Sequence, residues 1–268
     1  MKFTKMAAAG NDFILIDNRR KHVSGREKDF FRNICRRRYS VGADGVILLE
    51  KSSHADILYR HFNSDGLPAG MCGNGARCIS LYAYKKKITE KSLSLEAGGE
   101  IYQADCRGNF ISVTFPYPLK IEPDKKVFPE FRDREAGFIW VGVPHFVIFT
   151  DELDRLDVET EGRKYRCHSK FEKGTNVDFV EILEKKSIKL RTYERGVEAE
   201  TESCGTGAVA SALYAHLLEG LSPPLQVSTR GGILEVEWDP DHKHVSLTGK
   251  AEFVYEGRLT PMAAPARE

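Results

Sequence analysis

The chain has 268 residues, 41% of them hydrophobic, and carries 40 Lys and Arg against 39 Asp and Glu, a formal net charge of +1. This length can bury a proper core as one large or two ordinary domains, and the balanced charge provides no field that would attract nucleic acid or an anionic membrane. There is no secretory apolar segment at the start, and no stretch approaches the ~18 apolar residues of a membrane span. We therefore expect a soluble, cytoplasmic protein that binds a small molecule and neither nucleic acid nor a membrane.

Short apolar runs separated by turn residues predict a strand-rich chain. In the first half we expect strands at 13–16, 46–49, 57–59, 100–104 and 110–115, and a charged amphipathic helix over 19–38. The second half repeats the pattern at 146–149, 177–180, 188–190, 233–238 and 244–248, with a polar segment at 151–171. Each half is predicted to be a set of short strands around one or two helices.

Two glycine-punctuated turns, Cys72-Gly73-Asn74-Gly75 and Cys204-Gly205-Thr206-Gly207, lie 132 residues apart. The same shift aligns other glycines and apolar residues along the chain, which indicates two copies of one structural unit. We expect the boundary near Pro116-Tyr117-Pro118. The first half would then comprise residues 1–117 with the C-terminal segment 253–268, and the second half residues 118–252.

The segments after the two turns predict central helices. Residues 208–215 are apolar or small nearly all round, and residues 76–84 are similar except for Arg77. Such helices are surrounded by protein. The expected fold class is therefore α/β (α+β), with two pseudo-symmetric domains that are each a curled, mostly antiparallel sheet around a central helix.

A cysteine at a helix N-terminus is chemically useful, because the free N–H groups bind a carboxylate and the helix dipole lowers the pKa of the thiol. An amino-acid carboxylate held by both turns would place its α-carbon between Cys72 and Cys204. One thiolate could then remove the α-proton while the other thiol protonates the opposite face. Fixed dipoles would stabilise the carbanion-like transition state, so no cofactor is required.

Other interpretations of the turns are weaker. Phosphate binding is a rival, but neither turn has the Gly-Lys-Ser/Thr of a P-loop or a Gly-x-Gly-x-x-Gly fingerprint. The six cysteines include no Cys-x2-Cys pair, so we expect no metal site. A redox disulfide between Cys72 and Cys204 is a further alternative, although reduced thiols are expected in a chain without a signal peptide.

Several motifs together resemble the diaminopimelate epimerase family, a group of cofactor-independent amino-acid racemases and epimerases. They are Gly10-Asn11-Asp12-Phe13, Asn63-Ser64-Asp65-Gly66, the Cys72–Cys78 segment, Gly174-Thr175-Asn176-Val177, and Tyr193-Glu194-Arg195-Gly196 followed by the Cys204 turn. The likeness runs from about Phe3 to Tyr255. It implies two similar α/β domains with the active site between them, a homodimer, and conversion of L,L- to meso-diaminopimelate on the route to lysine and peptidoglycan.

The resemblance also implies roles for individual residues. Cys72 and Cys204 would be the base and acid pair. The remaining substrate contacts would be Asn11, Asn63, Gly73, Asn74, Asn176, Glu194, Arg195, Gly205 and Thr206. Arg195 suits a distal carboxylate because a guanidinium can hold it by two parallel hydrogen bonds, and Glu194 suits an ammonium group.

One position departs from the family pattern. Many members have Asn in a Gly-Asn-Pro-His segment, where this chain has Gly142-Val143-Pro144-His145. Val143 removes one distal polar contact, which leaves another amino acid, such as histidine or glutamate, as an alternative substrate. We expect His145 near the site, behind the residues that touch substrate. A non-catalytic binding protein of the same fold is a second alternative.

Overall fold

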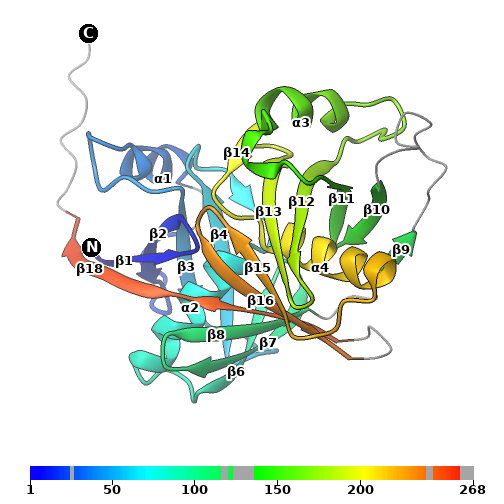
Figure 1. Cartoon of the computed structure of the whole chain (residues 1–268). Helices are drawn as coiled ribbons and strands as arrows, with labels where there is room; N and C mark the ends of the chain where they lie inside the picture. The colour runs from blue at the N-terminus through cyan, green and yellow to red at the C-terminus, as the bar shows by residue number, and fades with distance from the viewer. Residues whose placement is uncertain (25–26, 116–119, 123–135, 240–243, 260–268) are drawn as a thin grey trace, which may run out of the picture. The chain divides into compact units, whose positions relative to one another are not determined.

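The computed structural model describes residues 1–24, 27–115, 120–122, 136–239 and 244–259 (Figure 1). They form two compact units, residues 1–109 with the segment from 251, and residues 110–250. The boundary expected near Pro116-Tyr117-Pro118 lies outside the described residues, as do residues 260–268. Strand β8 (Phe110–Phe115), expected in the first half, pairs with β17 (Val245–Lys250) and so belongs to the second unit.

The first unit is one mostly antiparallel sheet with the strand order β18-β1-β2-β3-β4-β6-β7, and β5 beside β4. Its strands are β1 (Lys2–Ala8), β2 (Asn11–Asp17), β3 (Gly45–Glu50), β4 (Ile57–Asn63), β5 (Pro68–Ala69), β6 (Ser92–Ala97), β7 (Glu100–Arg107) and β18 (Glu252–Arg258). The pairs β2–β3 and β4–β6 are parallel. Each parallel pair is joined through a helical crossover, as parallel neighbours require.

The second unit repeats this topology with the order β9-β10-β11-β12-β13-β15-β16-β17-β8, and β14 beside β13. Its further strands are β9 (Lys120–Glu122), β10 (Ala136–Val141), β11 (Val143–Phe149), β12 (Asn176–Glu184), β13 (Ser187–Glu194), β14 (Ala199–Thr201), β15 (Leu225–Thr229) and β16 (Gly232–Trp238). Here β11–β12 and β13–β15 are the parallel pairs. The predicted pseudo-symmetric fold is confirmed.

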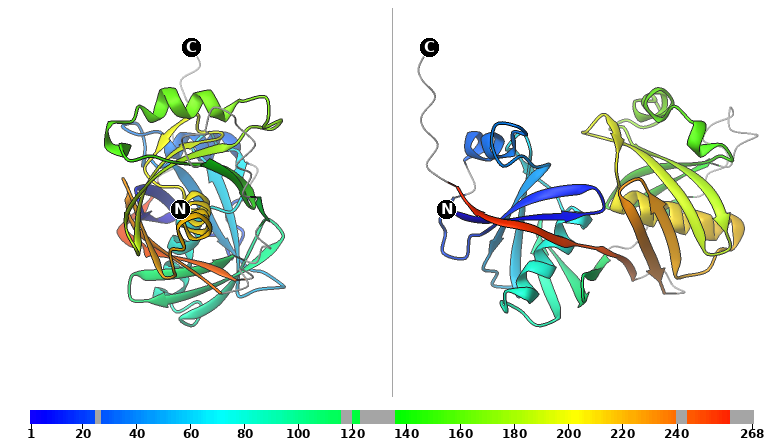
Figure 2. Two further views of the ribbon diagram at one scale, coloured as in Figure 1. Left: turned by 45° about the vertical axis from the view of Figure 1, so that its right-hand side comes forward. Right: turned by 60° about the vertical axis from the view of Figure 1, so that its left-hand side comes forward.

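A central helix lies against the sheet of each unit (Figure 2). Helix α2 (Gly73–Lys85) is buried from residue 74 to 83, and α4 (Gly205–Glu219) from residue 207 to 215. Strands on several sides contact each helix: β1 to β4, β7 and β18 contact α2, and β10 to β13 and β15 to β17 contact α4. Because the surroundings are protein on all sides, the helices are apolar nearly all round.

A smaller helix covers the opposite face of each sheet. Helix α1 (Lys28–Cys35) buries Phe31 and Ile34 against Val46 and Phe62. The helix predicted over 19–38 was therefore too long. The polar segment 151–171 contains the short 3₁₀ helix η2 (Leu153–Arg155) and α3 (Val158–Arg166), which packs on β12 and β13. Strand β3 is therefore covered on both faces and is buried throughout.

Within the part of the chain described here, no helix is both long and apolar enough to cross a membrane.

Candidate active site

Both cysteines occupy the N-cap position of a central helix in nearly the same backbone conformation. Cys72 has φ −115° and ψ 120°, and Cys204 has φ −115° and ψ 113°. The first helical hydrogen bonds run from Ala76 N–H to Cys72 O (2.8 Å) and from Ala208 N–H to Cys204 O (2.9 Å). The N–H groups that precede them, those of the first helical turn, have no acceptor within the helix. Each turn therefore offers an anion-binding helix start beside a thiol.

The second glycine of each turn is required by close packing. A Cβ on Gly75 would overlap the hydroxyl oxygen of Tyr59 and lie 3.3 Å from Ile47 Cδ1. A Cβ on Gly207 would lie 2.5 Å from Asp178 Oδ1. Glycine thus lets each helix start lie directly on its sheet, in addition to leaving space for a ligand.

In the first unit, hydrogen bonds bring Asn74 and Asn11 together beside Cys72. Asn74 Nδ2 donates to Asn11 Oδ1 (2.6 Å), and Asn11 Nδ2 donates to Asp44 Oδ2 (3.1 Å). Asn63 is exposed at the end of β4, where its backbone N–H closes a turn with Leu67 O (2.9 Å). Asn63 therefore takes part in a turn at the end of β4, apart from the Asn11–Asn74 hydrogen bond.

Arg77 is a buried cation that sequence reasoning missed. Its side chain is completely buried in α2, and Nη2 donates to Asn74 Oδ1. Among the described residues, Nε and Nη1 have no hydrogen-bond partner. Burial lowers the pKa of Arg77 to about 10, so it remains charged at neutral pH. The only sequence signal was a charged residue interrupting an apolar helix.

In the second unit, a buried polar cluster surrounds Cys204. Its Sγ accepts a hydrogen bond from Gly207 N–H (3.4 Å) and lies 3.5 Å from Thr206 Oγ1. His145 Nε2 lies 2.9 Å from the same hydroxyl, so the structure places His145 beside two predicted site residues. Burial raises the pKa of Cys204 well above its ordinary value, with Glu194 and Asp178 acting in the same direction.

Asn176 ties the Glu194-Arg195 segment to β11. Its Nδ2 donates to Pro144 O (2.9 Å), and its Oδ1 accepts from Arg195 N–H (2.8 Å). Burial raises the pKa of Glu194, and the nearby Asp178 carboxylate adds to that rise. Val143 begins β11 one residue before Pro144.

Asp178 is the second residue that sequence reasoning missed. It is completely buried, and its Oδ2 lies 2.6 Å from Nδ1 of the equally buried His145. Its Oδ1 accepts a hydrogen bond from Thr192 Oγ1 (2.7 Å). A lone acid inside the apolar strand run 177–180 was the available signal, because a buried carboxylate requires partners.

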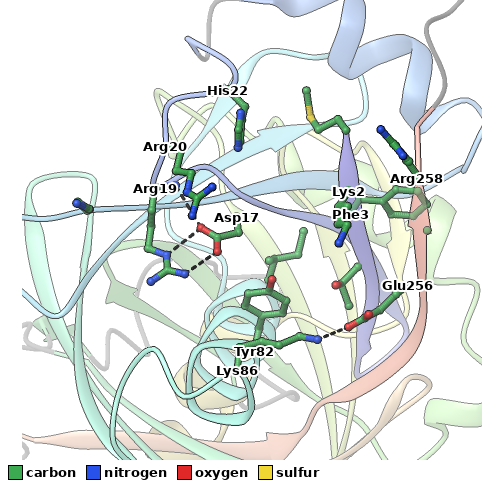
Figure 3. A pocket seen from close by; sticks show the side chains of 15 residues that line it. Lys2, Phe3, Asp17, Arg19, Arg20, His22, Tyr82, Lys86, Glu256 and Arg258 are labelled. Carbon is green, nitrogen blue, oxygen red and sulfur yellow. Dashed lines mark hydrogen bonds and ion pairs between the residues drawn. The ribbon is translucent and has the colours of Figure 1, made fainter.

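A separate cavity of about 1160 Å³ lies in the first unit, between β1, β18 and the segment after β2 (Figure 3). Two ion pairs stand in its wall, Arg19 with Asp17 (2.7 Å) and Lys86 with Glu256. None of the described residues that line it is a predicted site residue. This cavity is therefore distinct from the cysteine turns.

Comparison with solved structures defines the class of fold. The chain matches a PhzF-family phenazine biosynthesis protein of Bacillus anthracis with TM-score 0.71, at 16% identity over 97% of this chain and 99% of that one. It also matches a hydroxyproline epimerase of Agrobacterium vitis with TM-score 0.66, at 15% identity over 97% and 90%. The chain therefore has the same fold as these two proteins.

Sequence comparison is more specific. The family model for diaminopimelate epimerase matches residues 3–115 and 137–254. The diaminopimelate epimerase of Aquifex aeolicus is 38% identical over 97% of this chain and 98% of that protein, and that of Hydrogenobaculum sp. is 41% identical over 97% and 99%. The chain belongs to the diaminopimelate epimerase family, as the motifs predicted.

Proposed function

We propose that the chain is an isomerase that inverts one α-carbon of diaminopimelate, converting the L,L to the meso form in lysine and peptidoglycan biosynthesis. One observation carries the proposal: two cysteines stand in the same N-cap conformation at the starts of two equivalent central helices. We further propose that the enzyme works in the cytoplasm as a homodimer. A solution mass twice the 30.2 kDa of one chain would support the dimer.

The proposed reaction needs one thiolate and one thiol. The thiolate takes the α-proton, forming S–H as the C–H bond breaks and leaving a carbanion delocalised into the α-carboxylate. The second thiol gives its proton to the opposite face and becomes the thiolate, so the two cysteines exchange states in each turnover. The helix-start N–H groups of Gly73, Asn74, Gly205 and Thr206 would bind the carboxylate and stabilise its growing charge.

The remaining predicted contacts keep capacity for substrate. Asn11 Nδ2 donates to Asp44 and Asn74 Nδ2 donates to Asn11, and each of these amide nitrogens carries two N–H groups. The Arg195 guanidinium is half-buried, with Nη1 3.4 Å from Lys173 O and Gly174 O, distances at the limit of hydrogen bonding. It therefore has donors for a distal carboxylate. We propose Asn63, Asn176 and Glu194 as further substrate contacts, with Glu194 suited to an ammonium group.

Deuterium exchange tests the reaction and the substrate together. Purified protein is incubated in deuterated water with diaminopimelate, histidine or glutamate, and α-deuterium is measured by mass spectrometry. Uptake into diaminopimelate, with meso product, is expected. Exchange of another amino acid but not diaminopimelate would identify a racemase with a different substrate. Val143 motivates this alternative, because it lacks the polar side chain found at this position in many family members. No exchange at all, combined with binding, would indicate a non-catalytic protein.

Arg195→Lys tests recognition of the distal carboxylate. A lysine cannot make the two parallel hydrogen bonds of a guanidinium. We expect KM for diaminopimelate to rise about tenfold or more, with a smaller change in kcat. The control is the rate of deuterium exchange into an amino acid without a distal carboxylate, which Arg195→Lys should change less. Equal losses for both compounds would show that Arg195 only supports the local fold.

A further inference from the structure

A row of hydrogen-bonded side chains, all buried except the half-buried Thr206, runs from the sheet of the second unit to Cys204. Thr192 donates to Asp178 (2.7 Å), Asp178 meets His145 Nδ1 (2.6 Å), His145 Nε2 meets Thr206 (2.9 Å), and Thr206 Oγ1 lies 3.5 Å from Cys204 Sγ. The members come from β11, β12, β13 and the first turn of α4. Every link is a hydrogen-bond contact between side chains that are far apart in sequence or at a helix start.

For a neutral His145 imidazole, the direction of these hydrogen bonds follows from Asp178. A carboxylate only accepts hydrogen bonds, so the proton of His145 lies on Nδ1. In neutral imidazole the other nitrogen is then an acceptor, and the Thr206 hydroxyl donates to Nε2. The lone pairs of Thr206 Oγ1 remain to accept the S–H of Cys204. The Asp178 carboxylate therefore orients this row of hydrogen bonds so that Cys204 is stabilised in its protonated thiol form.

The first unit shows that this carboxylate is not needed to build the fold. Ile47 pairs with His61 across β3 and β4, in the place where Asp178 pairs with Thr192 across β12 and β13. Ile47 also packs against the second glycine of the first turn as Asp178 packs against Gly207. The same position thus accepts an apolar residue. A buried carboxylate there carries a desolvation cost that apolar packing avoids.

We propose that Asp178 is a positioning residue for the reaction proposed above: it holds His145 in the Nδ1–H form and thereby keeps Cys204 as the thiol of the resting enzyme. Cys204 then acts first as proton donor, and Cys72 as base. After Cys204 has given up its proton, the Thr206 hydroxyl turns from His145 Nε2 to the new thiolate. The Gly207 N–H supports that thiolate, and no net proton is added to His145.

The charged and titratable groups around Cys204 act in the same direction. Asp178 on β12 and Glu194 on β13 are both acidic and raise the pKa of the thiol together with burial, while His145 on β11 lies behind Thr206. Asp178 is in addition connected to Cys204 by the hydrogen-bond contacts of His145 and Thr206. Asp178→Asn removes the negative charge and keeps the size of the side chain.

Asp178→Asn in a Cys72→Ala background provides the test. The rate at which iodoacetamide alkylates Cys204 is measured against pH by mass spectrometry of the Cys204 peptide. Removing the carboxylate should lower the midpoint by about one pH unit and raise the rate at neutral pH about tenfold. Glu181→Gln, an acid on the same strand, is the matched control and should leave the midpoint unchanged. An unchanged midpoint in a folded Asp178→Asn protein overturns the proposal.

A second measurement uses the protein without substitution at Asp178. Nitrogen NMR of ¹⁵N-histidine-labelled protein should show His145 neutral and protonated on Nδ1; a proton on Nε2 alone would contradict the proposal even if the variant failed to fold. Neither measurement needs substrate. Failure of the proposed epimerisation would appear instead as absent deuterium exchange in the wild-type enzyme, so the two failures are distinguishable.

Discussion

The two cysteine turns share backbone conformation, glycine positions and place in the topology, but they are built on buried charges of opposite sign. The Cys72 helix contains the buried guanidinium of Arg77, where the 132-residue repeat has Val209 in the other unit. The Cys204 helix starts on the buried carboxylate of Asp178, where the first unit has Ile47. The duplicated scaffold thus provides two similar carboxylate-binding helix starts. The buried charge beside the cysteine therefore differs in sign between the two units.

Removal of each thiol in turn is the strongest test of the proposal that Cys72 and Cys204 act as a base and acid pair. Cys72→Ala and Cys204→Ala should each reduce epimerisation by about 10³-fold or more, because each removes one of two proton-transfer groups. Conversion of L,L- to meso-diaminopimelate is measured by chromatography of the stereoisomers. Full activity in either variant would refute the two-base scheme. Cys167→Ala, at an exposed cysteine, is the control and should be fully active.

Arg77→Leu should separate activity from stability. Loss of the guanidinium releases Asn74 Oδ1 and removes the cation near Cys72, so we expect kcat to fall about tenfold to a hundredfold. Replacing an incompletely paired buried charge by an apolar residue should leave the free energy of unfolding unchanged or raise it. Denaturant unfolding and steady-state kinetics measure the two quantities. A large loss of stability with full kcat per folded molecule would show that Arg77 serves only packing.

His61 should make the first unit sensitive to acid. Burial lowers its pKa from 6.5 to about 4, so the unfolded chain binds the proton first as the pH falls. Stability is therefore retained above about pH 6.5 and lost towards pH 4, by up to ~3 kcal/mol. His61→Gln should flatten this dependence of the free energy of unfolding. The equivalent place in the second unit holds Thr192, whose side chain does not titrate in this range.

Substitution of the second glycine of each turn has the smallest expected effect. It tests the different side chains against which Gly75 and Gly207 pack. Gly75→Ala and Gly207→Ala should each lower the free energy of unfolding by ~1–3 kcal/mol through overpacking. Adding Tyr59→Phe removes the oxygen that a Gly75 Cβ would overlap, so it should recover part of the loss in Gly75→Ala and none in Gly207→Ala. Equal recovery in both, measured by thermal unfolding, would contradict the packing described.

The sequence by itself determined much of this protein. Apolar runs bounded by turn residues predicted ten of the strands, but not β1, β6, β10, β15, β18 or the short β5, β9 and β14. Two helices without a polar face had to be surrounded by protein. The 132-residue repetition of cysteines and glycines predicted a duplicated fold, and the motifs identified the family. These signals are readable because each is local or periodic, and depends on residues that are close in sequence.

Only the tertiary structure decided which buried polar groups meet. His145 and Asp178 are 33 residues apart and contact each other because β11 and β12 are parallel neighbours. Likewise β8 joins the second unit through hydrogen bonds to β17, far along the chain. A buried polar group is stabilised by the partner that the topology brings to it. The sequence therefore located both cysteines, whereas the different surroundings of Cys72 and Cys204 depended on the fold.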